Sequence, residues 1–460
     1  MLQRITENVS YCDLLHKAAE AADPVKRLEY ISAFAVSTVS SNVNRYSKPF
    51  NPLLGETYEL IREDIGFKII CEQVSHHPPI SAFHTESIKN NDWEFYGFIN
   101  PKIKFWGKSV EIYPKGKLTL KLKKYNETYS WQQVTCCVHN IIIGKLWFEY
   151  YGTMEISCQE NGYKSVLNFK PYSWFNKELN RVDGFIYDKS KNKKKALYGY
   201  WTHCMYSCNP NEFDEYVRSD KQLPMVKLDE NFNEVEASYK GSTSSSLSEN
   251  FQNQHSFSDL LRLVHSNNTD SLKKASFNLN NQEKIEFNLD LDEKQDELSV
   301  MSENENNEEN ENLKKSVSVK NLHTNLSSIS LPSDYYIMQQ LELFEIWRAS
   351  PRPFNSSDYY SFNYFTMSLN ELKEEYKLIL PPTDSRYRTD VRELELGNLD
   401  RASEEKLRLE EKQREAAKQR KDDYIPKWFD YSKDLKTSEE SWTFNKKYWL
   451  RNFTDCPDLY

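Results

Sequence analysis

The feature that most constrains the fold is a long stretch, from about Tyr58 to Thr202, in which apolar and polar residues alternate. The run Lys117 to Lys123 reads Lys-Leu-Thr-Leu-Lys-Leu-Lys, so its leucines share one face of an extended strand. Asn161-Gly162 stands between two such runs and is typical of a tight hairpin turn, and Asp188 to Lys195 indicates a longer one. Because no helical pattern long enough for a βαβ crossover interrupts the stretch, we expect an antiparallel meander that curls into a barrel.

Aromatic residues are concentrated in the same stretch. In an antiparallel barrel such side chains fill the interior by default, and only a barrel too wide to fill itself leaves a cavity. We therefore expect them to lie in the core. The residues concerned are Trp93, Phe95, Tyr96, Phe98, Phe105, Trp106, Trp131, Trp147, Phe148, Tyr150 and Tyr151.

Helical sequence precedes the strands and a mixed pattern follows them. From about Ile5 to Arg45, alanines and larger apolar residues fall at helical spacing, and Pro24 is placed to begin a helix. Later, strand-like aromatic sequence surrounds Trp347 and runs from Tyr359 to Met367. A long charged helix is expected from about Asp400 to Lys421. The expected fold class is mainly β with helices, that is, α+β.

A segment rich in Ser, and then in Asn and Glu, separates these parts from about Tyr239 onward. Such a composition cannot bury enough apolar surface to fold, so it predicts a disordered insert over 238–332 that interrupts one domain made of 1–237 and 333–460. Between Ser242 and Ser330 there are 15 Asp and Glu against 8 Lys and Arg, so most of the formal charge of −9 lies there. The remainder can present a basic face to a membrane surface.

The chain has neither a membrane span nor the layout of a signal peptide. No apolar run approaches the roughly 18 to 20 residues that a span needs, and Met1 to Glu7 lacks a basic region followed by an apolar one. We therefore expect a cytosolic protein. Its eight cysteines follow neither zinc-ribbon nor disulfide spacing and are expected to be reduced core residues. A zinc site at Cys136, Cys137 and His139 is disfavoured because strand alternation separates the ligands, so no metal is expected.

Two adjacent histidines follow an apolar strand. The strand has one well-buried face over Phe67 to Cys71, and Pro78-Pro79 cannot continue a paired ladder, so it should end at His76 and His77. Protonated histidines donate from both ring nitrogens, and two of them beside lysine or arginine can hold a phosphate without a metal. The simpler alternative is a turn that carries surface histidines.

Three segments taken together resemble the lipid-binding domain of the oxysterol-binding protein-related family. They are Asn51 to Tyr58 (NPLLGETY), Glu72 to Pro79 (EQVSHHPP) and Leu380 to Arg388 (LPPTDSRYR). The resemblance extends from about residue 3 to the carboxy terminus apart from the insert, and is greatest to the branch that contains related proteins 1 and 2. It implies an incomplete antiparallel β-barrel that encloses a lipid tunnel, with a helical N-terminal segment and a C-terminal helical subdomain packed outside.

The resemblance also implies a site for a phosphoinositide headgroup. Spacing of four and four places Lys406, Glu410 and Arg414 on one helical stripe. Both basic groups could then face a phosphate while the glutamate holds the arginine in line. The alternative is a solvated helix with Glu–Arg pairs. The residues carried over from the family are Lys48, Pro49, Phe50, Asn51, His76, His77, Lys406, Glu410 and Arg414.

The function implied is lipid transfer, in which a sterol and a phosphoinositide occupy one tunnel in turn and are exchanged between intracellular membranes that the protein contacts peripherally. The implied partners are those lipids, with no cofactor and no nucleic acid. A lipid sensor or scaffold that binds either lipid without net transport is the alternative. Asn42 is a candidate partner for the sterol hydroxyl by position only. In the family a short amphipathic lid precedes the segment that begins here at Leu2, so either the recorded start is internal to a longer protein or this form lacks a lid. In the second case a bound lipid is expected to be held loosely.

A lipid hydrolase with Ser75 as nucleophile and His76 or His77 as base is the remaining alternative. The chain has no Gly-x-Ser-x-Gly elbow, and neighbouring residues of a strand point to opposite faces. An adjacent Ser-His pair is therefore poorly placed for catalysis, and we do not expect an enzyme.

Overall fold

The computed structural model describes residues 1–173, 179–218, 343–420, 423–435 and 438–460. The described residues on both sides of the gap from 219 to 342 belong to one compact unit. The insert expected over 238–332 lies outside the described residues, and the domain boundaries stay predictions.

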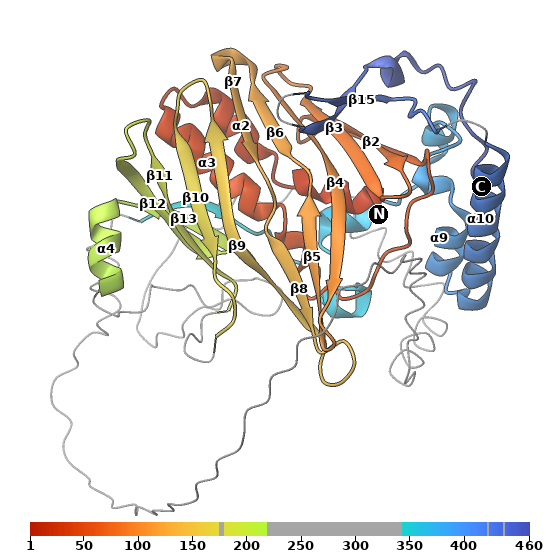
Figure 1. The fold of residues 1–460 in the computed structure, drawn as a ribbon, viewed down its shortest axis with the longest axis horizontal. Coiled ribbons are helices and arrows are strands. Elements are labelled where there is room, and N and C mark those ends of the chain that lie inside the picture. Colours follow the sequence, from red (N-terminus) through yellow and green to blue (C-terminus); the bar gives the residue numbers. More distant parts are fainter. Residues whose placement is uncertain (174–178, 219–342, 421–422, 436–437) are drawn as a thin grey trace, which may run out of the picture. The chain divides into compact units, whose positions relative to one another are not determined.

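One large antiparallel sheet dominates the described residues (Figure 1). Its strands are β1 (Thr57–Arg62), β2 (Phe67–Ser75), β3 (Ile80–Ser87), β4 (Trp93–Phe105), β5 (Ser109–Lys115), β6 (Leu118–Leu122), β7 (Glu127–Trp131), β8 (Thr135–His139), β9 (Trp147–Cys158), β10 (Lys164–Phe169), β11 (Arg181–Tyr187), β12 (Lys193–Tyr200), β13 (Cys204–Cys208) and β14 (Phe344–Arg348).

The sheet is partly closed into a ring. The main path runs β1-β2-β3-β4-β5-β8-β9-β10-β11-β12-β13-β14, with β1 and β14 at its two ends. The long strands β4 and β9 are also joined a second time, because β6 pairs with β4 and with β7, and β7 pairs with β9. This topology confirms the prediction of an incomplete antiparallel barrel.

The two hairpins predicted from turn residues are present. Gly162 has a φ of +73° between β9 and β10, a conformation that glycine adopts without a steric penalty. The longer connection from β11 to β12 spans Asp188 to Asn192, where Lys191 is left-handed. Turn chemistry therefore determined both positions correctly.

Three N-terminal helices pack on the inner face of the sheet: α1 (Leu2–Thr6), α2 (Asp13–Glu20) and α3 (Pro24–Ser37). The Asp23 carboxylate accepts a hydrogen bond from the Val25 amide, and Pro24 occupies the first helical position, where a missing N–H has no cost. Phe34 of α3 packs edge-on against Phe95 of β4 at 5.1 Å between ring centroids. Figure 1 shows these red helices behind the strands. Short 3-10 turns follow at η1 (Glu7–Val9) and η2 (Ser40–Asn42).

The C-terminal part covers the outer face. Phe98 of β4 is buried there in a cluster with Trp428, Phe429 and Phe444. The hairpin of β15 (Phe429–Lys433) and β16 (Glu440–Phe444) supplies two of these side chains. The remaining elements are η3 (Lys123–Tyr125), α4 (Pro210–Arg218), η4 (Ser356–Tyr359), α8 (Tyr364–Ser368), η5 (Glu374–Leu378), η6 (Ser385–Tyr387), α9 (Thr389–Glu395), α10 (Leu399–Gln419) and η7 (Lys447–Leu450).

The strand expected from Tyr359 to Met367 is wrong. Tyr360 and Ser361 are both left-handed, which interrupts an extended chain, and the Asn363 side chain accepts from the Thr366 amide to begin α8. By contrast, the strand around Trp347 and the charged helix are confirmed as β14 and α10. No helix in the described ranges has the length and apolar character needed to cross a bilayer.

Candidate functional site

The adjacent histidines lie in the turn between β2 and β3. β2 ends at Ser75, which pairs with Ile80 at the start of β3, so the turn interrupts the ladder as predicted. The His76 ring is half-buried and the His77 ring is exposed. Their centroids lie 4.5 Å apart with the planes at 70°. The two imidazoles therefore lie together at one edge of the turn.

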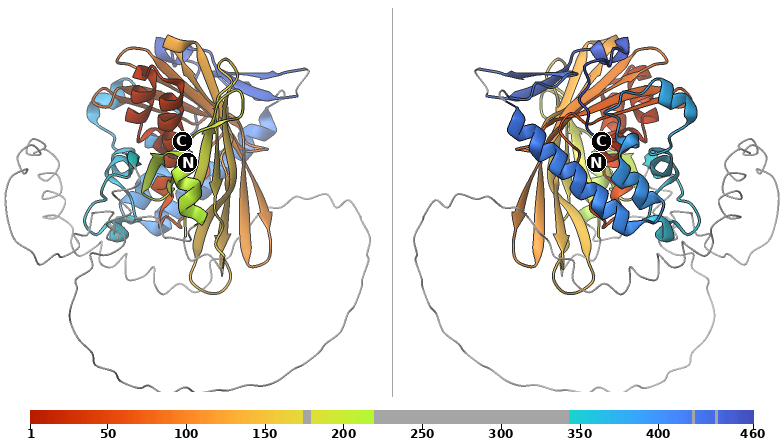
Figure 2. Two further views of the ribbon diagram at one scale, coloured as in Figure 1. Left: turned by 90° about the vertical axis from the view of Figure 1, so that its left-hand side faces the viewer. Right: turned by 90° about the vertical axis from the view of Figure 1, so that its right-hand side faces the viewer.

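Gln413 of α10 joins this turn to a second segment. Its amide oxygen accepts from the Leu54 N–H at 2.8 Å, and its amide nitrogen lies 3.0 Å from His76 Nε2. Because the Leu54 N–H can only donate, the amide must direct its NH2 group toward the histidine. His76 Nε2 is then the acceptor and the ring proton lies on Nδ1. The right-hand view of Figure 2 shows α10 as the long blue helix.

Burial and the neighbouring His77 lower the pKa of His76, and Glu410 opposes them. The pKa of a free histidine is about 6.5, so His76 is neutral at pH 7. An anionic group placed beside it would favour the protonated ring.

The charged stripe on α10 is arranged differently from the expectation. Glu410 forms an ion pair with Lys406 at 2.8 Å, whereas within the described part of the chain it has no ion pair with Arg414. A glutamate with basic residues four positions away on each side can pair with only one at a time, and spacing cannot say which. Arg414 is exposed. The buried side chains Ala402 and Leu409 anchor the helix.

Arg388 binds the segment that contains the Asn51 motif through buried polar contacts. One guanidinium nitrogen donates to the Asn51 carbonyl at 2.8 Å and lies 2.9 Å from Glu56. The other pairs with Asp390 at 2.6 Å, and Glu56 also accepts from the Leu53 amide. Two of the three segments that carry the family resemblance are thus joined by one buried ion-pair network.

These contacts bring Leu54, His76, His77 and Gln413 into one cluster, and Glu410, three residues before Gln413, acts on His76 through its charge. The sequence did not identify Gln413. Its position three residues after Glu410, which places both side chains on one face of a helix, was the only available indication. The headgroup assignment of Lys48, Pro49, Phe50, Asn51, His76, His77, Lys406, Glu410 and Arg414 stays a prediction. Among these, the Lys48 side chain is exposed on the segment that leads to Asn51.

Asn42, the candidate partner for a sterol hydroxyl, is engaged by the protein at both ends of its amide. Its oxygen accepts two bonds from Arg4, at 3.0 and 2.7 Å. Its nitrogen donates to the Tyr150 hydroxyl at 2.9 Å. These bonds give Asn42 a role in joining α1 to β9.

The strand alternation that disfavoured a zinc site is present in β8. Cys137 is buried, its neighbour Cys136 lies on the opposite face, and the His139 ring stacks on Trp147 at 4.1 Å while bonding Glu149 at 2.9 Å.

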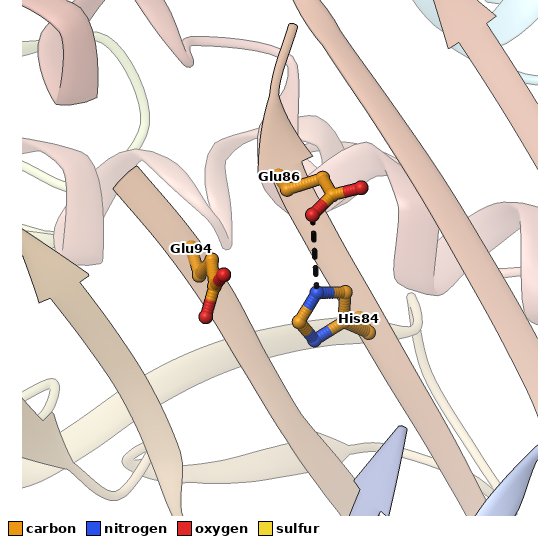
Figure 3. Close-up of side chains that lie close together, drawn as sticks. All are labelled: His84, Glu86 and Glu94. Carbon is orange, nitrogen blue, oxygen red and sulfur yellow. Dashed lines mark ion pairs between the residues drawn. The ribbon is translucent and has the colours of Figure 1, made fainter. Parts of the chain in front are cut away.

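A different group, His84, Glu86 and Glu94, has the composition of a metal site (Figure 3). The two glutamates are direct cross-strand neighbours on β3 and β4, and His84 Nε2 lies 3.8 Å from Glu86. Each carboxylate is matched by a lysine at 2.7 Å, Lys68 for Glu86 and Lys123 for Glu94. The charge of the group is therefore balanced without a cation, and we interpret it as a charged ladder on the outer face.

Comparison with known proteins agrees with this geometry. The family model for oxysterol-binding protein matches residues 1–453. Oxysterol-binding protein-related protein 1 of Rattus norvegicus is 42% identical over 462 residues, which cover 100% of this chain and 39% of that protein. Related protein 2 of Mus musculus is 39% identical over 466 residues, which cover 100% of this chain and 79% of that protein.

Two solved structures are similar over 100% of this chain. The crystal structure of the Osh1 ORD domain in complex with cholesterol has a TM-score of 0.65 at 25% identity and is covered over 84% of its length. The Osh3 ORD in complex with PI(4)P from Saccharomyces cerevisiae has a TM-score of 0.63 at 28% identity and is covered over 88%. The chain belongs to the oxysterol-binding protein family, a family of lipid-binding proteins rather than of enzymes.

Proposed function

We propose that this chain is a lipid-transfer protein that binds a sterol or a phosphoinositide in one site and exchanges the two between membranes. The observation that carries the proposal is the cluster in which Gln413 joins His76 to Leu54, because it brings three separate segments to one place. Similar domains have been solved with cholesterol, with ergosterol and with PI(4)P, which supports both classes of ligand.

The phosphate groups of a headgroup would be held by charge-assisted hydrogen bonds. His76 and His77 would donate ring N–H groups, and Lys48, Lys406 and Arg414 would supply positive charge. Arg414 is exposed, so it is free to turn toward a ligand. The Lys406 ammonium already pairs with Glu410, so it would have to contact the phosphate and that carboxylate at the same time.

The apolar part of either lipid would occupy the inner side of the sheet. That face is lined by aromatic and aliphatic side chains between the strands and the N-terminal helices. A sterol ring system and acyl chains have the same requirement for apolar surroundings, so one interior suits both. The polar rim then compensates the headgroup charge, whose burial would otherwise be costly.

Extraction of lipids from liposomes tests the headgroup assignment. The double variant His76→Ala, His77→Ala should lose phosphoinositide extraction by at least about tenfold, because each charged hydrogen bond contributes roughly a factor of ten. Sterol extraction should be largely retained. Arg401→Ala is a matched control, since this exposed arginine lies on another face of α10. Unchanged phosphoinositide extraction by the double variant would refute the assignment, and equal loss of both lipids would indicate a folding defect.

Transfer between two liposome populations separates an exchanger from a sensor. If the chain exchanges lipids, sterol movement to the acceptor should accelerate when the acceptor contains phosphoinositide, which returns in the opposite direction. A sensor or scaffold would bind both lipids in the extraction assay and leave the transfer rate at the protein-free value.

A further inference from the structure

Two neighbouring loop tips expose large apolar side chains. One tip joins β4 to β5 and the other joins β8 to β9. Aromatic residues from the first were expected in the core, but Phe105 and Trp106 are 57% and 54% exposed, which corrects that expectation. The exposed apolar residues of the two tips are Ile103, Phe105, Trp106, Ile142 and Ile143, the last being 84% exposed. We call these residues the apolar tips.

The two tips are fixed side by side by backbone hydrogen bonds. β5 pairs with β8 up to Ser109 opposite His139, and the Ile141 amide donates to the Lys108 carbonyl at 3.3 Å. Within the second tip, the Asn140 side chain donates to the Lys145 carbonyl at 3.0 Å. These backbone and side-chain hydrogen bonds therefore hold the two tips, and their exposed side chains, next to each other.

The exposure arises because β4 extends past the end of the hydrophobic core. Trp93 and Phe95 lie on the face of β4 that packs against the helices, and both are fully buried. Ile103 and Phe105 continue the same face, since residues an even number apart on a strand share a face. In the described part of the chain nothing buries these two side chains, and the apolar face emerges into solvent.

The apolar tips are flanked by more positive than negative charge, and one carboxylate, Glu111 of β5, accepts a hydrogen bond from the Trp106 indole at 2.7 Å. Residues 101–110 and 139–148 contain four lysines and no aspartate or glutamate. The lysines are Lys102, Lys104, Lys108 and Lys145, all of them exposed. Lys104 lies over the Trp106 ring at 3.8 Å, so the charge and the aromatic surface are adjacent.

The apolar tips lie at the same end of the sheet as the histidine turn. Ser81 pairs with Ile99, so the turn from His76 to Pro79 lies level with the part of β4 just after Ile99. β4 continues to Phe105, about five residues or roughly 17 Å beyond that level. A surface that received the tips would thus face the histidines.

We propose that the apolar tips insert into an anionic lipid bilayer and dock the domain with its histidine turn toward the membrane. Tryptophan and branched aliphatic side chains flanked by lysine match the interfacial region of such a bilayer, where apolar groups enter and cations meet anionic headgroups. A second copy of this chain is a poorer occupant, because a symmetric contact would bring the same lysines together. The proposal does not rest on phosphoinositide binding, since the tips and the turn share no residue.

Vesicle co-sedimentation of the full chain tests the proposal. The vesicles contain phosphatidylcholine alone or with phosphatidylserine, and neither contains phosphoinositide or sterol, so the result is independent of the headgroup site. The variant Trp106→Ala, Ile143→Ala should reduce binding to the phosphatidylserine vesicles by about tenfold or more. Leu378→Ala, Leu396→Ala is the matched control, because both leucines are also strongly exposed, at 88% and 73%, but lie outside the apolar tips.

A second variant tests the charge. Lys102→Ala, Lys104→Ala, Lys108→Ala should weaken binding to phosphatidylserine vesicles and flatten its dependence on salt, with little effect on phosphatidylcholine alone. Wild-type binding in the two tip variants, each shown to melt like the parent, would overturn the proposal. So would a concentration-dependent dimer, seen by sedimentation and lost in Trp106→Ala, since it would assign the tips to contacts between copies.

Discussion

At the scale of single residues, the side chain that organises the candidate site is uncharged. Gln413 holds the Leu54 amide and the His76 ring at once, and its orientation leaves the proton of His76 on Nδ1. His76 and His77 were found from the sequence because a diproline after a strand places them at an edge. Gln413 could not be found in this way, because a glutamine on a charged helix carries no local signal of its partner hundreds of residues away.

The lowered pKa of His76 predicts a pH-dependent affinity. The neutral ring of the free protein should take up a proton when an anionic headgroup binds, so phosphoinositide affinity should rise as pH falls from about 8 to about 6. The phosphate itself titrates near pH 6. The informative quantity is therefore how steeply the phosphoinositide affinity changes with pH, measured by calorimetry and compared between the parent and His76→Gln.

Gln413→Glu provides the matched variant for this pH dependence. It places a carboxylate beside His76 while still accepting a hydrogen bond from the Leu54 amide. The pKa of His76 should therefore rise, and the affinity should change with pH over a higher pH range. An identical pH profile in the parent and in both variants would show that His76 does not titrate with binding.

At the scale of elements, alternation identified the strands and one buried ion pair joins them to the helices. Arg27 of α3 donates to both oxygens of Glu127 on β7, at 2.8 and 2.7 Å, and both side chains are buried. The Tyr129 hydroxyl and the Asn161 amide also donate to Glu127. The pair thus connects the helical lobe to the short strands that join β4 and β9 a second time.

Breaking this pair should destabilise the protein. Arg27→Ala leaves the Glu127 carboxylate buried without its cationic partner, so the free energy of unfolding should fall by about 3 to 5 kcal/mol, measured by urea denaturation at neutral pH. The double variant Arg27→Leu, Glu127→Leu should lose less, because no unpaired charge remains. If the single variant loses no more than the double one, the pair has no such role.

At the scale of the whole molecule, Arg388 joins segments that lie far apart in the chain. It contacts the Asn51 carbonyl and Glu56 ahead of β1, and Asp390 at the start of α9. The segments from Asn51 and from Leu380 that carry the family resemblance therefore serve the fold as well as the site.

Arg388→Ala should loosen the segment from Asn51 to Glu56, which Gln413 links to the histidine turn. Glu56 and Asp390 would be left buried without their cationic partner, so we expect the free energy of unfolding to fall by about 3 to 5 kcal/mol and amide hydrogen exchange to become faster at Leu53 and Leu54. Arg408→Ala removes an exposed pair with Glu405 and should change stability by no more than about 1 kcal/mol. Unchanged exchange at the two leucines would contradict the role given to Arg388.

The sequence by itself determined the antiparallel strands, their tight turns, the start of α3 at Pro24 and the end of β2 at the histidines. These features depend on the two-residue repeat, turn chemistry and helix capping, which act over a few neighbouring residues. Tertiary structure decided that Glu410 pairs with Lys406, that Gln413 hydrogen-bonds to His76, and that the apolar face of β4 extends past the core into solvent. Each of these depends on where distant elements pack, and a local pattern is the same whether its partner is present or not.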